Sequence, residues 1–144
     1  MIKNRSVPTD VLLPHVVYRD VANAATWLKA TFGFEEDYRY GDPAQGVLMH
    51  LGQAWVMLTS ARPGRATPAQ SGAWTQMLTI FVEDIDGHYS RVKSGGARVV
   101  EDLNETAYGE RQFAAEDLDG HRWLFSRHAR NVSPKDWGAK ENQG

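Results

Sequence analysis

The chain has 144 residues, of which 42% are hydrophobic and 24% charged, the ordinary usage of a folded soluble domain. Its net charge of −2 and pI near 6.2 exclude the basic footprint of a nucleic-acid-binding protein. The absence of cysteine excludes disulfides, thiolate metal sites and a cysteine nucleophile. No apolar run approaches the roughly 20 residues of a membrane helix, and the N-terminal segment lacks the apolar stretch of a secretion signal. We therefore expect one cytoplasmic domain with no nucleic-acid or membrane partner.

The first half of the chain has the pattern of a strand, a helix and three further strands. Residues 11–19 are apolar and β-branched, as in a strand. Asp20 has a carboxylate that can cap a helix, and Gly33 supplies the residue at which that helix ends. Between them an apolar face recurs at helical spacing, at Val21, Ala24, Ala25, Leu28 and Phe32. The following strands are expected at Glu36–Tyr40, Val47–Leu51 and Ala54–Ser60, with a tight turn at Gly52-Gln53 between the last two.

The second half repeats this order after a linker. Residues 61–72, ARPGRATPAQSG, have the composition of a loop, and we expect their basic side chains to be solvated. The two candidate helix caps, Asp20 and Asp84, lie 64 residues apart, and the helix-ending glycines, Gly33 and Gly96, lie 63 apart. A shared period in element order and spacing indicates an internal repeat. The strands expected in the second half are Met77–Val82, Arg98–Glu101, Arg111–Ala115 and His121–Arg127.

The repeat predicts an α+β fold of two tandem β-α-β-β-β modules. We place module one at about residues 10–60, the linker at 61–74, module two at about 75–128 and a C-terminal tail at 129–144. In the tail, Ser133 is a candidate cap with Pro134 at the first helical position. This pattern predicts a short helical turn, from which Trp137 packs back on the body of the protein.

Three motifs connect these modules with a known family. They are PHVVYRDVANAATWLKATFGF at residues 14–34, FVEDIDGHYSRVKSGGA at 81–97 and YGERQFAAEDLDGHRWLF at 108–125. Together they resemble the vicinal oxygen chelate superfamily, which includes glyoxalase I, extradiol dioxygenases and bleomycin-resistance proteins. The closing stretch is most similar to the PhnB-like or glyoxalase-like subgroup. The resemblance implies that the modules form a cup-shaped mixed sheet around a cavity.

The resemblance also implies where a metal would be held. In catalytic branches of the superfamily, each module lends one divalent ion a His or Gln seven residues before the capping Asp and a carboxylate from its final strand. These positions fall here on Leu13 and Met57 in module one and on Met77 and Leu124 in module two. Such side chains lack the nitrogen and oxygen donors that Zn²⁺, Fe²⁺ or Ni²⁺ prefer. We therefore expect no metal and no cofactor, and an apolar cavity of the kind that takes small molecules.

Residues two positions away from these four along a strand lie on the same face and are also predicted to bind the ligand. Strand alternation adds His15, Trp55, Thr59, Thr79 and Arg122 to Leu13, Met57, Met77 and Leu124.

Several of these side chains have two interpretations. His15 is a candidate general base or ligand contact, or it is satisfied by a neighbouring backbone group. Trp55 is able to stack on a flat ligand or to serve in the core. Arg122 is able to clamp a carboxylate or phosphate, or to pair with Asp117 or Glu116 near the turn.

The leading hypothesis is a metal-free binder of a small apolar or aromatic molecule. The alternative is an enzyme, either a lyase, isomerase or dioxygenase with its metal elsewhere, or an acid–base catalyst that uses His15. A third hypothesis is an interaction module without a ligand. Exposed sheet edges in each module favour a homodimer.

Overall fold

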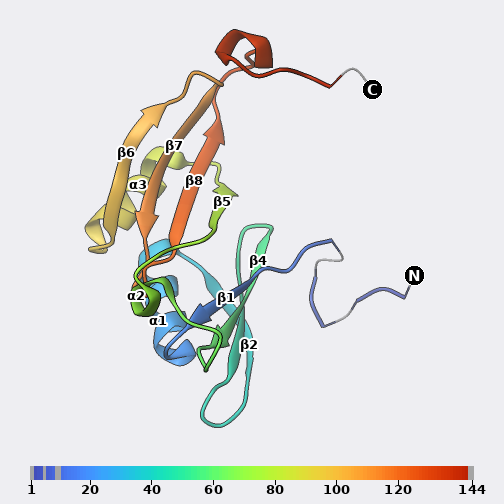
Figure 1. The fold of residues 1–144 in the computed structure, drawn as a ribbon, viewed down its shortest axis with the longest axis vertical. Coiled ribbons are helices and arrows are strands. Elements are labelled where there is room, and N and C mark those ends of the chain that lie inside the picture. The colour runs from blue at the N-terminus through green and yellow to red at the C-terminus, as the bar shows by residue number, and fades with distance from the viewer. Residues whose placement is uncertain (1, 5, 9–10, 143–144) are drawn as a thin grey trace. The chain divides into compact units, whose positions relative to one another are not determined.

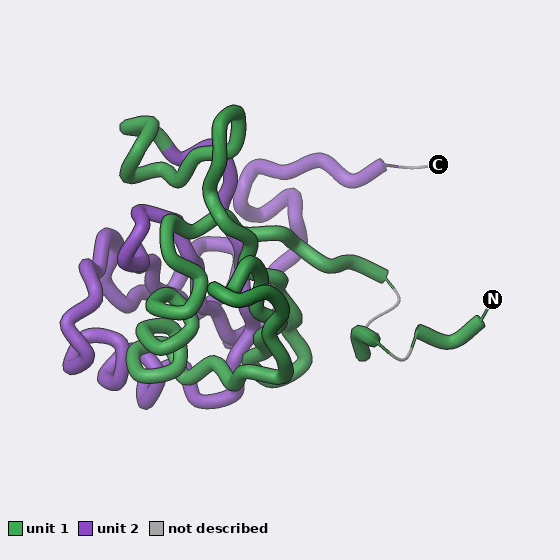
Figure 2. The backbone as a smooth tube through the Cα atoms, turned by 90° about the horizontal axis from the view of Figure 1, so that it is seen from below, with its two compact units in different colours: residues 1–73 green, residues 74–144 purple. Residues whose placement is uncertain are grey.

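The computed structural model describes residues 2–4, 6–8 and 11–142. They form two compact units, which we call unit 1, Met1–Ala73, and unit 2, Trp74–Gly144 (Figure 2). The predicted modules fall one in each unit.

Unit 1 is a mixed four-stranded sheet with a helix packed on it (Figure 1). The strand order is β1-β4-β3-β2, with β1 parallel to β4 and the other neighbours antiparallel. The turn at Gly52 joins β3 and β4, as predicted. The elements are β1 (His15–Tyr18), α1 (Val21–Phe32), β2 (Glu35–Tyr40), β3 (Gly46–Leu51), β4 (Ala54–Ser60) and α2 (Pro68–Ser71).

Unit 2 repeats this topology with the strand order β5-β8-β7-β6, again with one parallel pair, β5 and β8. Its elements are β5 (Met77–Phe81), α3 (Ile85–Ser94), β6 (Arg98–Glu105), β7 (Glu110–Glu116), β8 (Arg122–His128) and the 3₁₀ turn η1 (Pro134–Trp137). The predicted α+β fold of two tandem β-α-β-β-β modules is confirmed.

The two long helices begin as the sequence predicts. The Asp20 carboxylate accepts a hydrogen bond from the backbone N–H of Asn23 at 3.0 Å, and Asp84 accepts one from Gly87 at 3.0 Å. Each bond satisfies an amide that the first helical turn leaves without a partner. Helix α1 ends at Gly33, whose φ of 85° is left-handed and suits glycine.

The main cores lie between each helix and one face of its sheet. In unit 1 the buried strand residues Val16, Val47 and Leu58 share the face covered by α1, whose buried Leu28 and Phe32 point toward it. In unit 2 the rings of Phe113 and Phe125 lie 5.3 Å apart, and both are fully buried. We call the opposite face of each sheet its open face.

The first strand is shorter than predicted, because β1 begins at His15 rather than at residue 11. Its ladder with β4 starts where His15 pairs with Met57, and Pro14 has no amide to extend it. Val11 is 94% exposed.

The linker contains a short helix that we did not predict, α2. Thr67 and Gln70 form a capping box around Pro68 at the first helical position. The predicted turn in the tail is confirmed as η1, and the Trp137 ring lies 5.3 Å from that of Tyr108. Among the helices described, none is long and apolar enough to cross a membrane.

Candidate functional site

The open face of unit 1 has an apolar centre. Met57 of β4 lies beside Leu48 of β3, and both are buried together with Val7. Leu13 and Trp55, which are partly buried, pack against this cluster. Three of its five members, Leu13, Trp55 and Met57, are predicted ligand-binding residues, so the fold brings them together.

Val7 is the member of this cluster that sequence analysis missed. It is 7% exposed and packs on Leu48 and Met57, although it lies in an N-terminal segment without strand or helix. Asn4 shapes that segment, because its side-chain oxygen accepts hydrogen bonds from the amides of Ser6 and Val7 at 2.9 and 3.2 Å. A single valine in an irregular segment gives no periodic signal that could have revealed this contact.

A buried hydroxyl lies beside the apolar cluster. Thr59, another predicted site residue, is 4% exposed, and its Oγ1 has no hydrogen-bond partner among the described residues. It pairs across the sheet with Gly46, where a side chain would overlap the ring of Tyr40. Tyr40 therefore lies over Gly46, next to Thr59. A buried polar atom without a partner costs about 1–3 kcal/mol, which a ligand's hydrogen bond would recover.

Aromatic side chains surround the cluster. Register pairs Tyr38 with Leu48 and His50 with Trp55 on this face. The His50 ring stacks on Trp55 with centroids 4.4 Å apart. Its Nδ1 lies 2.9 Å from an oxygen of Asp37, which fixes the orientation of the imidazole. Sequence analysis did not select Tyr38, Tyr40 or His50, because they lie on β2 and β3, whereas the selected residues flank the four candidate metal positions on other strands.

His15 also lies on the open face, paired with Met57, and is exposed. No carboxylate or other side chain hydrogen-bonds to its ring among the described residues. The orienting partner that a general base needs is therefore missing from its surroundings.

The open face of unit 2 is polar around a small apolar centre. Met77 and Thr79 of β5 are exposed, and Leu124 of β8 lies between Thr79 and Ala114. Arg122 makes the second of its two predicted interactions: its guanidinium donates to Glu116 at 3.1 and 3.2 Å. The same guanidinium lies 5.1 Å from the centre of the Trp74 ring, a cation–π contact.

Two hydrogen-bonded pairs continue this polar face. Gln112, which is 5% exposed, donates to the Tyr108 hydroxyl at 3.0 Å. Glu110 lies 2.9 Å from Nδ1 of His128, and this hydrogen bond, helped by a second one to Asn131, raises the pKa of His128. Sequence analysis did not select these residues.

The residues at the family's metal positions do not fit a metal ion. Leu13 and Met57 in unit 1, and Met77 and Leu124 in unit 2, offer methyl groups or a thioether instead of imidazole or carboxylate donors. In the described ranges, no group of three His, Cys, Asp or Glu side chains is placed to hold one.

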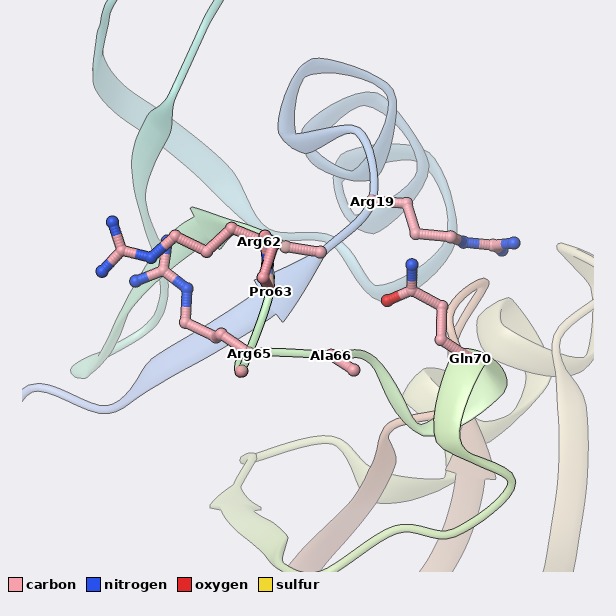
Figure 3. Close-up of a pocket in the computed structure, with 8 residues that line it drawn as sticks. Arg19, Arg62, Pro63, Arg65, Ala66 and Gln70 are labelled. Atoms are coloured by element: carbon pink, nitrogen blue, oxygen red, sulfur yellow. The ribbon is translucent and has the colours of Figure 1, made fainter.

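A hollow of about 500 Å³ lies elsewhere in unit 1, at the linker loop (Figure 3). None of the predicted site residues lines it. The lining residues are Arg19, Ala61, Arg62, Pro63, Gly64, Arg65, Ala66 and Gln70.

The fold agrees with what comparison with known proteins finds. Residues 12–125 match the model of the Glyoxalase/Bleomycin resistance protein/Dioxygenase superfamily. The chain belongs to this superfamily.

Relatives in sequence and structure span most of the chain. An uncharacterized protein of Mycobacterium bovis is 30% identical over 131 residues, which cover 85% of this chain and 86% of that protein. The crystal structure of TioX from Micromonospora sp. ML1 is similar with a TM-score of 0.71 and 27% identity, covering 83% of this chain and 99% of TioX. The fosfomycin resistance protein FosX of Listeria monocytogenes has a TM-score of 0.61 at 13% identity, covering 89% and 97% of the two chains, which is a likeness of fold alone.

Proposed function

We propose that this chain is a metal-free binding protein for a small apolar or aromatic molecule, which it holds on the open face of unit 1. One observation carries the proposal: the apolar cluster around Met57 lies next to Thr59, whose buried hydroxyl has no hydrogen-bond partner in the described part of the chain. Ligand sites commonly combine an apolar lining with a few polar groups that fix orientation.

The arrangement suggests what the ligand looks like. Its flat apolar body would pack on Met57 and Trp55, and a polar substituent would hydrogen-bond to Oγ1 of Thr59. Val7 already covers Met57, so the ligand would displace the N-terminal segment or insert beside it. The predicted residues Leu124, Met77, Thr79 and Arg122 lie on the open face of unit 2, and their part in ligand binding stays a prediction.

Fluorescence titration with N-phenyl-1-naphthylamine, a neutral aromatic probe, tests this function. We expect saturable binding that Trp55→Ala weakens about tenfold, since loss of a central aromatic contact typically costs more than 1 kcal/mol. The matched control is Trp137→Ala, which removes a half-exposed tryptophan from unit 2. No saturable binding, or equal losses in the two variants, would count against the proposal.

The enzymatic alternative depends on His15. Acid–base catalysis needs an oriented imidazole, and among the described residues no side chain hydrogen-bonds to His15, so binding is the better-supported function. A homodimer and a cytoplasmic location stay predictions. The exposed Phe81 and Met77 on edge strand β5 support the homodimer, which native mass spectrometry of the purified protein would test together with any retained ligand or metal.

A further inference from the structure

The linker loop carries two arginines that a tight turn holds side by side. Arg62, Pro63, Gly64 and Arg65 form a turn closed by hydrogen bonds from Arg65 N to Arg62 O at 2.8 Å and from Arg62 N to Arg65 O at 3.0 Å. Proline at the second position and glycine at the third, with φ of 83°, are typical of a type II turn. The bridge between Arg62 and Arg65 places their side chains on the same side of it, as Figure 3 shows.

One of the two guanidinium groups is fixed by the backbone. Nε and Nη2 of Arg65 both donate to the carbonyl oxygen of Ser60, with the Nε bond at 3.0 Å. This leaves Nη1 and the remaining N–H of Nη2 for another acceptor, because a guanidinium has five donors. The side chain is thus held in place before any ligand arrives, which lowers the entropy cost of binding.

Among the residues that the structure describes, no acidic side chain balances this pair. The residues lining the adjacent hollow include no Asp or Glu. Across the described ranges no ion pair involves Arg62 or Arg65, whereas Arg39, Arg98, Arg111 and Arg122 each have a carboxylate within 3.2 Å. Two unneutralised guanidinium groups on one side of a rigid turn form an electrostatic complement to a doubly charged oxyanion.

We propose that the Arg62-Pro63-Gly64-Arg65 turn is an anion site that binds a phosphate group. The hollow of about 500 Å³ beside it, which extends to Arg19 and Gln70, would receive the organic part of a phosphate monoester. Figure 3 shows the Gln70 amide directed toward the Arg19 side chain at the far end of the hollow. This site does not use the open face of unit 1, so it stands or fails independently of the function proposed above.

Titration with inorganic phosphate, followed by NMR of the arginine Nε–H resonances, tests the proposal at constant ionic strength. We expect saturable shifts of the Arg62 and Arg65 signals, and at least about a tenfold loss of affinity in Arg62→Gln. Arg98→Gln, which removes an exposed arginine of unit 2, is the control and should leave binding unchanged.

A second variant separates the turn from the charges. Gly64→Val keeps both arginines but disfavours the positive φ of the turn, so phosphate affinity should fall severalfold. Phenyl phosphate that binds more tightly than inorganic phosphate would indicate a monoester that uses the hollow, and equal affinities would indicate free phosphate. Shifts that do not saturate, that chloride reproduces, or that persist in Arg62→Gln would show solvated loop charges and overturn the proposal.

Discussion

Units 1 and 2 have the same strand order and the same pairing of a parallel edge strand with a central one, yet their open faces differ in chemistry. In unit 1 this face is an apolar cluster around Met57, covered by Val7 and flanked by aromatic rings. In unit 2 the corresponding face carries the Arg122–Glu116 ion pair and the Glu110–His128 hydrogen bond. The repeated topology therefore gives each unit an open face, and the side chains decide the chemistry of that face.

The turn between the last two strands of each unit is where we expect substitutions to differ most in their effect on stability. In unit 2 the Asp117 carboxylate accepts hydrogen bonds from the amides of Asp119 and His121 and from the indole of Trp123, at 3.0, 3.0 and 2.9 Å. Because Trp123 is 1% exposed, Asp117→Ala would leave a buried donor without a partner and cost about 3 kcal/mol. In unit 1 the corresponding turn has the exposed Gln53.

Urea unfolding of Asp117→Ala and Gln53→Ala measures this difference. We expect Gln53→Ala to stay within about 0.5 kcal/mol of the parent protein, as most exposed substitutions do. Equal losses in the two variants would contradict the structural role given to Asp117.

Unit 2 should also respond to mild acid. Burial lowers the pKa of His88 to about 4, with the positive charge of Arg91 adding to the effect, and the ring packs 4.4 Å from that of Phe125. Because the folded pKa lies below the unfolded value of 6.5, stability is fully present above pH 6.5 and falls as the pH drops toward 4. The loss should be about 2 kcal/mol after allowance for solvent screening of this partly exposed group.

The replacement His88→Leu should remove most of this dependence when unfolding is followed between pH 7 and pH 4. His128 has the opposite sign, because its raised pKa contributes stability below pH 6.5 that is lost as the pH rises through the folded pKa. If the unfolding free energy of His88→Leu falls with decreasing pH as steeply as that of the parent protein, other groups cause the loss of stability in acid.

The covering segment of unit 1 is expected to have a smaller effect. Val7→Ala removes two buried methyl groups from the cluster and should cost about 1 kcal/mol. It should also shift Trp55 emission to longer wavelength, because water gains access to the indole. Val11→Ala is the matched control, since Val11 is 94% exposed and should be neutral. Equal unfolding free energies and equal emission wavelengths in the two variants would contradict the packing of Val7 against the cluster.

The helix caps of the two units should contribute equally to stability. Asp20→Ala and Asp84→Ala each remove one side-chain acceptor from a first helical turn and should each cost about 1 kcal/mol in thermal unfolding. A cost confined to one variant would show that the repeat is not equivalent at its helix starts.

Local signals explain how much of the fold was predictable. Asp20, Gly33 and Asp84 act on their own helices through backbone groups a few residues away, so sequence spacing reveals them. The same holds for the tandem repeat and for the alternation that puts Trp55, Met57 and Thr59 on one face. The start of β1 was not predictable, because it depends on the pairing of His15 with Met57, which lies 42 residues further along the chain.

The site was predictable only in part for the same reason. Alternation identified which residues share a face, but not that Val7 packs against Met57. Nor did it reveal that Oγ1 of Thr59 lacks a hydrogen-bond partner among the described residues. Nor did it decide between the two interactions open to Arg122, because Glu116 meets it through strand pairing. The paired arginines at the linker looked like solvated charges until the turn geometry placed them together.

Methyl NMR of ¹³C-methionine-labelled protein during titration with N-phenyl-1-naphthylamine tests the central claim most directly. Met57 reports on the open face of unit 1 and the exposed Met77 on that of unit 2, while the buried Met49 lies on the face covered by α1. We predict a saturable shift of the Met57 methyl with the Met49 methyl unchanged. A Met57 signal that stays fixed while the probe binds elsewhere would contradict a ligand site on the open face of unit 1.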